Sequence, residues 1–440
     1  MLRKVDFENK NPTETTMGKA DFPQPFYSGL EYNPPVRGTW NIVHTGMLIP
    51  ESRQIFACAR GCLRGVILTA AEMNAMDRMS WISVEENDFI DGGLESNIID
   101  GVTEILNECE KLPPCVLLFV SCVHLFAGID FEMILQELSE KFSQVDFVDC
   151  YMTPTMRKNI SPDAKMRIQL YKPLKKVKPD PKSVNIIGCD FTTDADSELI
   201  KILSENGYEI KDITLCKTYE EYLQMGESVL NISFIPTAKE SGEQLSKRLS
   251  AKHLYLPLCY GYEETEENYK KLFDALNIPQ KDFSKEKAMC EKALENTFEV
   301  IGKTQIAIDY TACPRPLGLA RLLAEHGFNV TRIYCDVFNG EEKKDFDFLR
   351  ENYPDIKICS TLNAKMRFYH CDENEKILCI GQKAAYFCGS DYFVNIVSGG
   401  GYYGFKGIEK LCGLMTEAFR TPKDRKTVIS RKGLGCESCI

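Results

Sequence analysis

The chain has 440 residues, of which 44% are hydrophobic and 27% charged, with a formal net charge of −11; this length suggests roughly two to four domains. The acidic balance argues against a nucleic-acid-binding protein, which would carry a basic surface. We expect a cytoplasmic protein without a membrane span, because no apolar run approaches roughly 18 residues and the opening MLRKVDFENKNPTETT lacks the apolar core of a signal peptide.

The first informative segment is IFACARGCLRGVILTAAEM, which contains Cys58 and Cys62. If this segment is helical, cysteines four residues apart share one face. The nearby Arg60 and Arg64 favour the thiolate form. Two buried structural thiols are the alternative interpretation, since a CxxxC pair alone is only weakly informative. With 19 cysteines in the chain, we expect most to be small buried hydrophobes, a use of thiols that suits an anaerobe.

The second segment, VLLFVSCVHLFAGID, places Cys122 directly after an apolar run. Such a cysteine lies at the carboxyl end of a strand, where open α/β sheets build their sites. Because cysteine thiolates hold iron–sulfur clusters, we interpret Cys58, Cys62 and Cys122 as cluster ligands. His124 is a candidate to donate a hydrogen bond or a proton there, or else a satisfied buried side chain. Cys150, which ends the apolar run VDFVDC, either lines the same site or, as we expect, is a core thiol.

Three stretches repeat an apolar strand, a turn of small or polar residues, and an amphipathic helix. They begin at PPCVLLFVSC, SVNIIGCDFT and TQIAIDYTAC. This alternation predicts parallel sheets covered by helices. A lysine- and proline-rich linker before residue 180 and the charged helix KDFSKEKAMCEKALENTFEVIG before residue 300 divide the chain. The sequence therefore predicts an α/β protein of three doubly wound, Rossmann-like domains, residues 1–180, 181–299 and 300–440.

Further candidates lie in the last two predicted domains. Arg315, at a strand–helix turn in CPRPLGLARLL, either grips an anionic substrate or caps the turn structurally. Cys259 ends an apolar strand and is a candidate pocket residue. The glycines of VSGGGYYG allow close backbone approach to a ligand, but no GxxxxGK[ST] phosphate loop exists in the chain. The tail pair Cys436 and Cys439 is a weak candidate for a metal site or a redox disulfide.

Three domains in a row, with cysteines gathered in the first, resemble the nitrogenase component 1 superfamily. ENDFIDGG resembles the acidic segment of that family, SCVHLFAGIDFE its cysteine cluster segment, and VSGGGYYGFKGIEKL its segment in the third domain. The resemblance covers nearly the whole chain. It implies three domains around a central crevice, and an iron–sulfur cluster of the [4Fe-4S] type on Cys58, Cys62 and Cys122. A fourth ligand would come from a partner or a substrate.

The departures from the family pattern bear on activity. No cysteine precedes Cys58, so Cys62 would substitute for the expected upstream ligand. The two positions that hold the active-site cofactor of nitrogenase fall near Ser233 and Asn395, which are neither cysteine nor histidine. Reduction of dinitrogen is therefore not expected.

The resemblance implies an iron–sulfur subunit of a nitrogenase-like reductase complex. A separate ATP-dependent iron–sulfur reductase would supply low-potential electrons for an unknown substrate, and the other subunit would be a paralogous chain or a second copy. The alternatives are a scaffold that assembles a metal cluster or tetrapyrrole cofactor without turning it over, and a degenerate subunit that completes a site on its paralogue.

Overall fold

The computed structural model describes residues 13–27, 29, 31, 32, 34, 36, 38, 41–153, 160–249, 251–369, 371 and 375–430. The chain divides into two compact units, which are described separately. The described residues of unit 1 lie within Met1–Gly38, Asp194–Leu199 and Leu258–Ser430, and those of unit 2 within Thr39–Thr193 and Ile200–Pro257.

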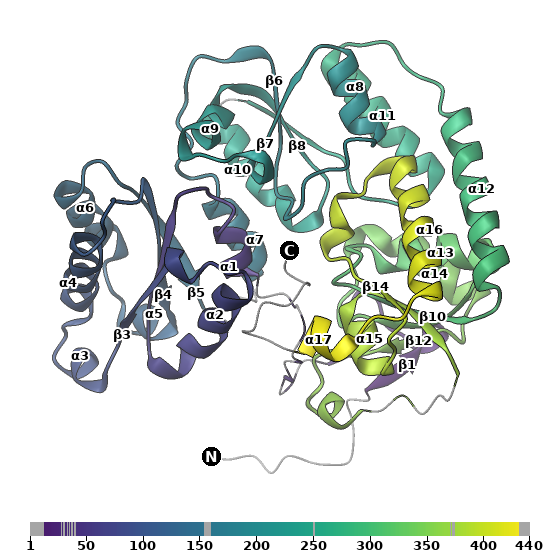
Figure 1. The fold of residues 1–440 in the computed structure, drawn as a ribbon, viewed down its shortest axis with the longest axis horizontal. Helices are drawn as coiled ribbons and strands as arrows, with labels where there is room; N and C mark the ends of the chain where they lie inside the picture. Colours follow the sequence, from purple (N-terminus) through teal and green to yellow (C-terminus); the bar gives the residue numbers. More distant parts are fainter. Residues whose placement is uncertain are drawn as a thin grey trace. The chain divides into compact units, whose positions relative to one another are not determined.

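The first sheet of unit 2 has four parallel strands in the order β3-β2-β4-β5 (Figure 1). Their bounds are β2 Arg53–Cys58, β3 Met79–Ser83, β4 Cys115–Ser121 and β5 Asp146–Met152. The accompanying helices are α1 Ile42–Gly46, α2 Arg60–Glu72, α3 Glu86–Ile90, α4 Leu94–Asn107, α5 Cys122–Ala127, α6 Phe131–Lys141 and α7 Pro162–Gln169. Every residue of β4 is buried, as expected for a parallel strand covered on both faces.

The alternation of side chains along a strand assigns the two faces of this sheet. Phe56 and Phe119 point to one face and stack with ring centroids 4.2 Å apart; they share a core with side chains of α1, α2 and α7. Ala57 and Val120 belong to the opposite core, which α4 and α6 complete. Cys58, two residues after Phe56 on β2, lies in the same core as Phe56.

The second sheet of unit 2 is also parallel, in the order β7-β6-β8-β9. The bounds are β6 Asp180–Ile186, β7 Glu209–Asp212, β8 Ser228–Ser233, β9 Lys252–Tyr255, α8 Glu198–Glu205, α9 Tyr219–Leu223 and α10 Lys239–Leu249. Its two central strands are joined by a buried side-chain hydrogen bond in which Asn185 Nδ2 donates to Asn231 Oδ1 over 2.8 Å.

The third sheet lies in unit 1, in the order β1-β12-β11-β10-β13-β14, and is parallel except for the edge strand β1, which runs antiparallel to β12. The strands are β1 Glu14–Thr16, β10 Gln305–Asp309, β11 Asn329–Tyr334, β12 Lys357–Cys359, β13 Ile377–Ile380 and β14 Phe393–Val394. The helices are α11 Tyr262–Leu276, α12 Ser284–Ile301, α13 Pro316–Glu325, α14 Lys343–Asn352, α15 Gln382–Cys388, α16 Gly404–Arg420 and α17 Arg425–Ser430.

The predicted α/β architecture with several parallel, helix-covered sheets is confirmed. The boundaries at residues 180 and 299 stay a prediction, as does the crevice. Within the described ranges, no helix combines the length and the apolar character needed to cross a membrane.

Candidate functional site

The cysteine edge, defined here by Cys58, Cys62 and Cys122, lies where strands β2 and β4 end. Cys58 is the last residue of β2, and Cys122 begins α5 directly after β4. The two strands are parallel neighbours with Ala57 opposite Val120. Adjacent strands are about 4.8 Å apart, so both cysteines reach the same edge of the sheet.

Cys62 lies on the first turn of α2, whereas Cys58 is in the strand before it. The expectation that both share one helical face is therefore wrong, since the chain changes from strand to helix at Ala59. Cys58 is fully buried, Cys62 is exposed and Cys122 is partly exposed. Burial, with a smaller effect of Cys62, raises the pKa of Cys58 to about 12, so metal binding there must displace a proton.

His124 lies in the first turn of α5, beside Cys122. Its Nδ1 accepts a hydrogen bond from the backbone N–H of Ser121 over 3.2 Å. Burial lowers the pKa of His124, so the imidazole is neutral near pH 7, and this hydrogen bond assigns its proton to Nε2. Nε2 is buried and has no hydrogen-bond partner among the described residues. A buried N–H donor without an acceptor is costly and calls for an explanation.

Large apolar side chains are exposed on the two helices that follow β3 and β4 at this edge. Phe89 and Ile90 end α3 and are 52% and 75% exposed; Phe126 of α5 is 76% exposed, and Leu125 beside it is 40% exposed. A patch of this kind is typical of a surface that another chain covers. The sequence pattern did not identify these side chains as an exposed surface.

An acidic groove of about 560 Å³ lies along β3, α3 and α4. Its charged lining consists of Asp88, Asp91, Asp100 and Glu104. Four carboxylates disfavour an anionic ligand there, so the groove is not a phosphate site.

Cysteine thiolates are the ligands that iron–sulfur clusters use, but the described residues of the cysteine edge bring together no complete ligand set. Within the part of the chain that the structure describes, no three His, Cys, Asp or Glu side chains are placed to hold a metal ion together. Two cysteines on adjacent strand ends, a third on the following helix and the unpartnered N–H of His124 fit a cluster whose ligand set a second chain completes. The expected core thiol Cys150 is fully buried in β5.

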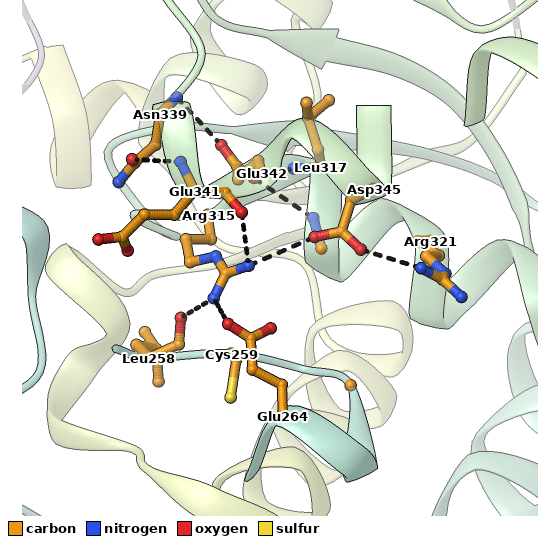
Figure 2. Close-up of polar contacts among 12 residues, drawn as sticks. Leu258, Cys259, Glu264, Arg315, Leu317, Arg321, Asn339, Glu341, Glu342 and Asp345 are labelled. Atoms are coloured by element: carbon orange, nitrogen blue, oxygen red, sulfur yellow. Dashed lines mark hydrogen bonds and ion pairs between the residues drawn. The ribbon is translucent and has the colours of Figure 1, made fainter. Parts of the chain in front are cut away.

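Arg315 lies at the N-terminus of α13 and is 2% exposed (Figure 2). Its Nη1 donates to Glu264 Oε1 over 2.5 Å, and its Nη2 lies 3.5 Å from Asp345 Oδ2. Burial lowers the pKa of Arg315, but the hydrogen bond and charge of Glu264 outweigh this effect and raise it overall. The guanidinium group of Arg315 is thus paired with two carboxylates. These contacts favour the structural alternative, and the substrate-gripping role stays a prediction.

Cys259 is held by its neighbours next to a very small cavity. Its Sγ lies 3.3 Å from Thr265 Oγ1 and accepts from Asn268 Nδ2 over 3.5 Å. The cavity, which Gly399 also lines, measures about 10 Å³, room for about one water molecule. Burial raises the pKa of Cys259 to about 12. A cavity of this size does not admit a substrate, and the role of Cys259 as a pocket residue stays a prediction.

Comparison with known proteins gives the family. The model of the nitrogenase component 1 type oxidoreductases matches residues 47–412. The chain belongs to this family. Among solved structures it is similar to "Nitrogenase Cp1 at pH 6.5", with a TM-score of 0.66 and 16% identity over 90% of this chain and 94% of that chain. A second, "Nitrogenase Cp1 at pH 5", gives 0.57 and 12% identity over 92% and 94%. A search of curated protein sequences finds no match.

Component 1 type oxidoreductases bind metal–sulfur clusters, are multimeric and work with an iron-protein reductase. Ser233 and Asn395, near which the resemblance predicts the cofactor-ligand positions of nitrogenase, are engaged in local hydrogen bonds. Ser233 Oγ lies 2.8 Å from His253 Nε2, and Asn395 Oδ1 accepts from Gln382 Nε2 over 2.9 Å. The tail pair Cys436 and Cys439 lies outside the described residues.

Proposed function

We propose that this component 1 type chain is the cluster-binding subunit of a nitrogenase-like reductase complex. Cys58, Cys62 and Cys122 would bind an iron–sulfur cluster, for which we propose the [4Fe-4S] type. An ATP-dependent iron–sulfur reductase would supply electrons for a substrate other than dinitrogen. The observation that supports this proposal best is the pairing of β2 with β4, since it brings cysteines 64 residues apart in the sequence to one sheet edge.

The cluster would supply single-electron transfer at low potential when bound. The residues of this chain would exclude water from the cluster and donate a hydrogen bond to it. The aromatic core beneath the edge, with Phe56 stacked on Phe119, excludes water from the inner side. His124 would donate its Nε2 hydrogen to a cluster sulfide, which satisfies the buried donor and raises the potential by stabilising the more negative state.

A second chain is needed for two reasons. The described residues provide no complete ligand set, and the exposed Phe89, Ile90 and Phe126 are apolar surface at the same edge. A paralogous subunit, or a second copy of this chain, that packs on the cysteine edge would cover the exposed apolar side chains and supply the remaining ligand. A subunit interface commonly buries an apolar centre of this composition.

The test is metal analysis of the full chain, purified without oxygen, alone and with a co-expressed component 1 type partner. Iron, acid-labile sulfide and the EPR spectrum after reduction are measured for the wild type, Cys58→Ala and Cys122→Ala. The matched control is Cys150→Ala, because Cys150 is buried in the same sheet. We expect about four irons per site, lost in both edge variants and kept in the control.

Equal iron content in all variants, or none in any preparation, would contradict cluster binding at these residues. If the cluster binds, ATP-dependent turnover with an iron-protein reductase distinguishes the reductase from the scaffold. A subunit that holds iron yet passes no electrons under those conditions would favour the scaffold.

A further inference from the structure

An unpaired strand edge lies in unit 2, on β3 of the first sheet. β3 is an outer strand of this sheet (Figure 1), and among the described residues it pairs only with β2. The N–H of Val84, directly after β3, donates to the carbonyl of Cys58 over 3.1 Å, so Val84 faces β2. Because successive residues of a strand point their backbone groups in opposite directions, Ile82 also faces β2, whereas Trp81 and Ser83 face outward.

The outward backbone groups of Trp81 and Ser83 have no hydrogen-bond partner within the described part of the chain. Exposed edges act as templates for a further strand, and proteins commonly block them with a bulge or a proline. β3 pairs with β2 without a bulge and contains no proline. The edge is therefore open to backbone pairing.

The acidic groove described above runs along this edge. Trp81, Ile82 and Ser83 line it together with residues of α3 and α4. Every charged side chain of the lining is a carboxylate. Asn97 also lines the groove, and its buried Oδ1 has no hydrogen-bond donor among the described residues. The groove thus favours a ligand that carries positive charge and N–H donors.

A strand added to β3 would place its side chains in two different environments, since they alternate between the faces of the sheet. Ile82 belongs to the core that α4 completes, so every second side chain of the added strand would face the carboxylates. Trp81 lies opposite Phe56 in the register, on the other face, and is 44% exposed. The intervening side chains would pack beside this ring, which favours apolar residues there.

We propose that the β3 edge binds an extended segment of a partner protein in which lysine or arginine residues alternate with apolar residues. The segment pairs with the backbone of Trp81 and Ser83 and becomes a fifth strand of the sheet. Backbone hydrogen bonds provide affinity in this mode of recognition, and the alternating side chains provide specificity. A second copy of the chain does not suit the edge, because it would bring two sets of carboxylates together.

Binding of a synthetic peptide to the full chain tests the proposal. A short fluorescein-labelled peptide of alternating lysine and valine is titrated with the protein, and fluorescence anisotropy is measured. We expect binding that weakens as salt is added, and none for a peptide of alternating glutamate and valine. A lysine–valine peptide with methylated backbone nitrogen atoms should not bind, since it cannot pair with the edge. Amide hydrogen exchange in residues 79–83 should slow when the unmodified peptide binds.

Two double variants separate the groove from general acidity of the surface. Asp100→Asn with Glu104→Gln removes two groove carboxylates, and we expect Kd for the lysine–valine peptide to rise about fivefold. The matched control is Glu132→Gln with Glu140→Gln, which removes two exposed carboxylates of α6 and should leave Kd unchanged. Ser83→Pro removes an outward N–H and should abolish binding, while the fold is kept because edge positions tolerate proline.

Four outcomes would overturn the proposal: no binding of the lysine–valine peptide, equal binding of its methylated form, equal effects of the two double variants, or unchanged exchange in residues 79–83. The peptide and exchange measurements use the wild type, so they decide the question even if a variant fails to fold. Association of the protein alone that Ser83→Pro abolishes would instead assign the edge to a second copy. None of these measurements involves iron, so failure here is distinguishable from failure of the proposed function.

Discussion

Replacing Arg315 with methionine tests whether this buried guanidinium serves the fold. The substitution keeps most of the side-chain volume but leaves Glu264 and Asp345 without their shared cation. Removing one partner of a buried ion pair typically costs about 3–5 kcal/mol, because the remaining charge stays buried.

We expect the loss of Arg315 to cost a free energy at the low end of that range. The Glu264 side chain is 41% exposed and regains water, while Asp345 keeps a second cation, Arg321, over 3.3 Å. We therefore expect Arg315→Met to lower the free energy of unfolding by about 3 kcal/mol. The matched control is Arg321→Met: this cation is 34% exposed, so its loss should cost under about 1 kcal/mol.

Urea denaturation followed by far-ultraviolet circular dichroism measures both effects. Trp81 lies on β3 in unit 2. Its fluorescence reports the unit without the substitution. We expect a lower midpoint by circular dichroism for Arg315→Met, and little change by fluorescence. If Arg315→Met and Arg321→Met are equally stable, Arg315 does not stabilise the fold, and its guanidinium is available for an anionic substrate.

Two further predictions concern buried positions of the third sheet. Burial raises the pKa of Glu342 to about 7, although the hydrogen bonds that its carboxylate accepts from backbone N–H groups lower it. The pKa of Glu342 is therefore higher in the folded than in the unfolded protein. Its contribution to stability is present at low pH and is lost as the pH rises through about 7. Between pH 4.5 and pH 8, the free energy of unfolding of the wild type should fall by up to about 3 kcal/mol relative to that of Glu342→Gln, as measured by urea denaturation. A difference between the two proteins that stays constant with pH would contradict this prediction. Gly381 has φ +112° and an added Cβ would lie 2.2 Å from Asp309 Oδ2, whereas Gly389 has φ +67° and open space. Gly381→Ala should therefore lower the free energy of unfolding by more than about 2 kcal/mol, and Gly389→Ala by about 1 kcal/mol, as measured by thermal denaturation. Equal losses in the two variants would show that the steric contact with Asp309 is relieved and would contradict the prediction.

The sequence predicts local βα units well because their signals are local. The apolar run before Cys122 specifies the buried strand β4. In the second and third repeats a glycine marks the end of the helix, at Gly207 and Gly327, both with positive φ. The charged stretch before residue 300 is α12, as expected. Periodicity suffices for such elements, since each is specified by side chains within one or two turns.

Features that depend on distant segments were not predictable in this way. The strand–helix change between Cys58 and Cys62 depends on β2 pairing with strands on both sides. The partners of Arg315 come from α11 and α14, and no spacing in the sequence links them to it. The contact of Cys388 Sγ with the Tyr334 hydroxyl likewise forms only when α15 packs on the sheet.

The antiparallel edge strand β1 has a consequence for how the chain acquires its fold. Glu14–Thr16 pairs with Lys357–Cys359, so this segment is synthesised long before the strand with which it pairs. Sheets with such long-range pairings close slowly, and the segment waits without a partner through most of synthesis. The third sheet is therefore complete only once β14 at Phe393–Val394 has been synthesised, while the first sheet of unit 2 has all its strands within residues 53–152 and is ready to fold far earlier.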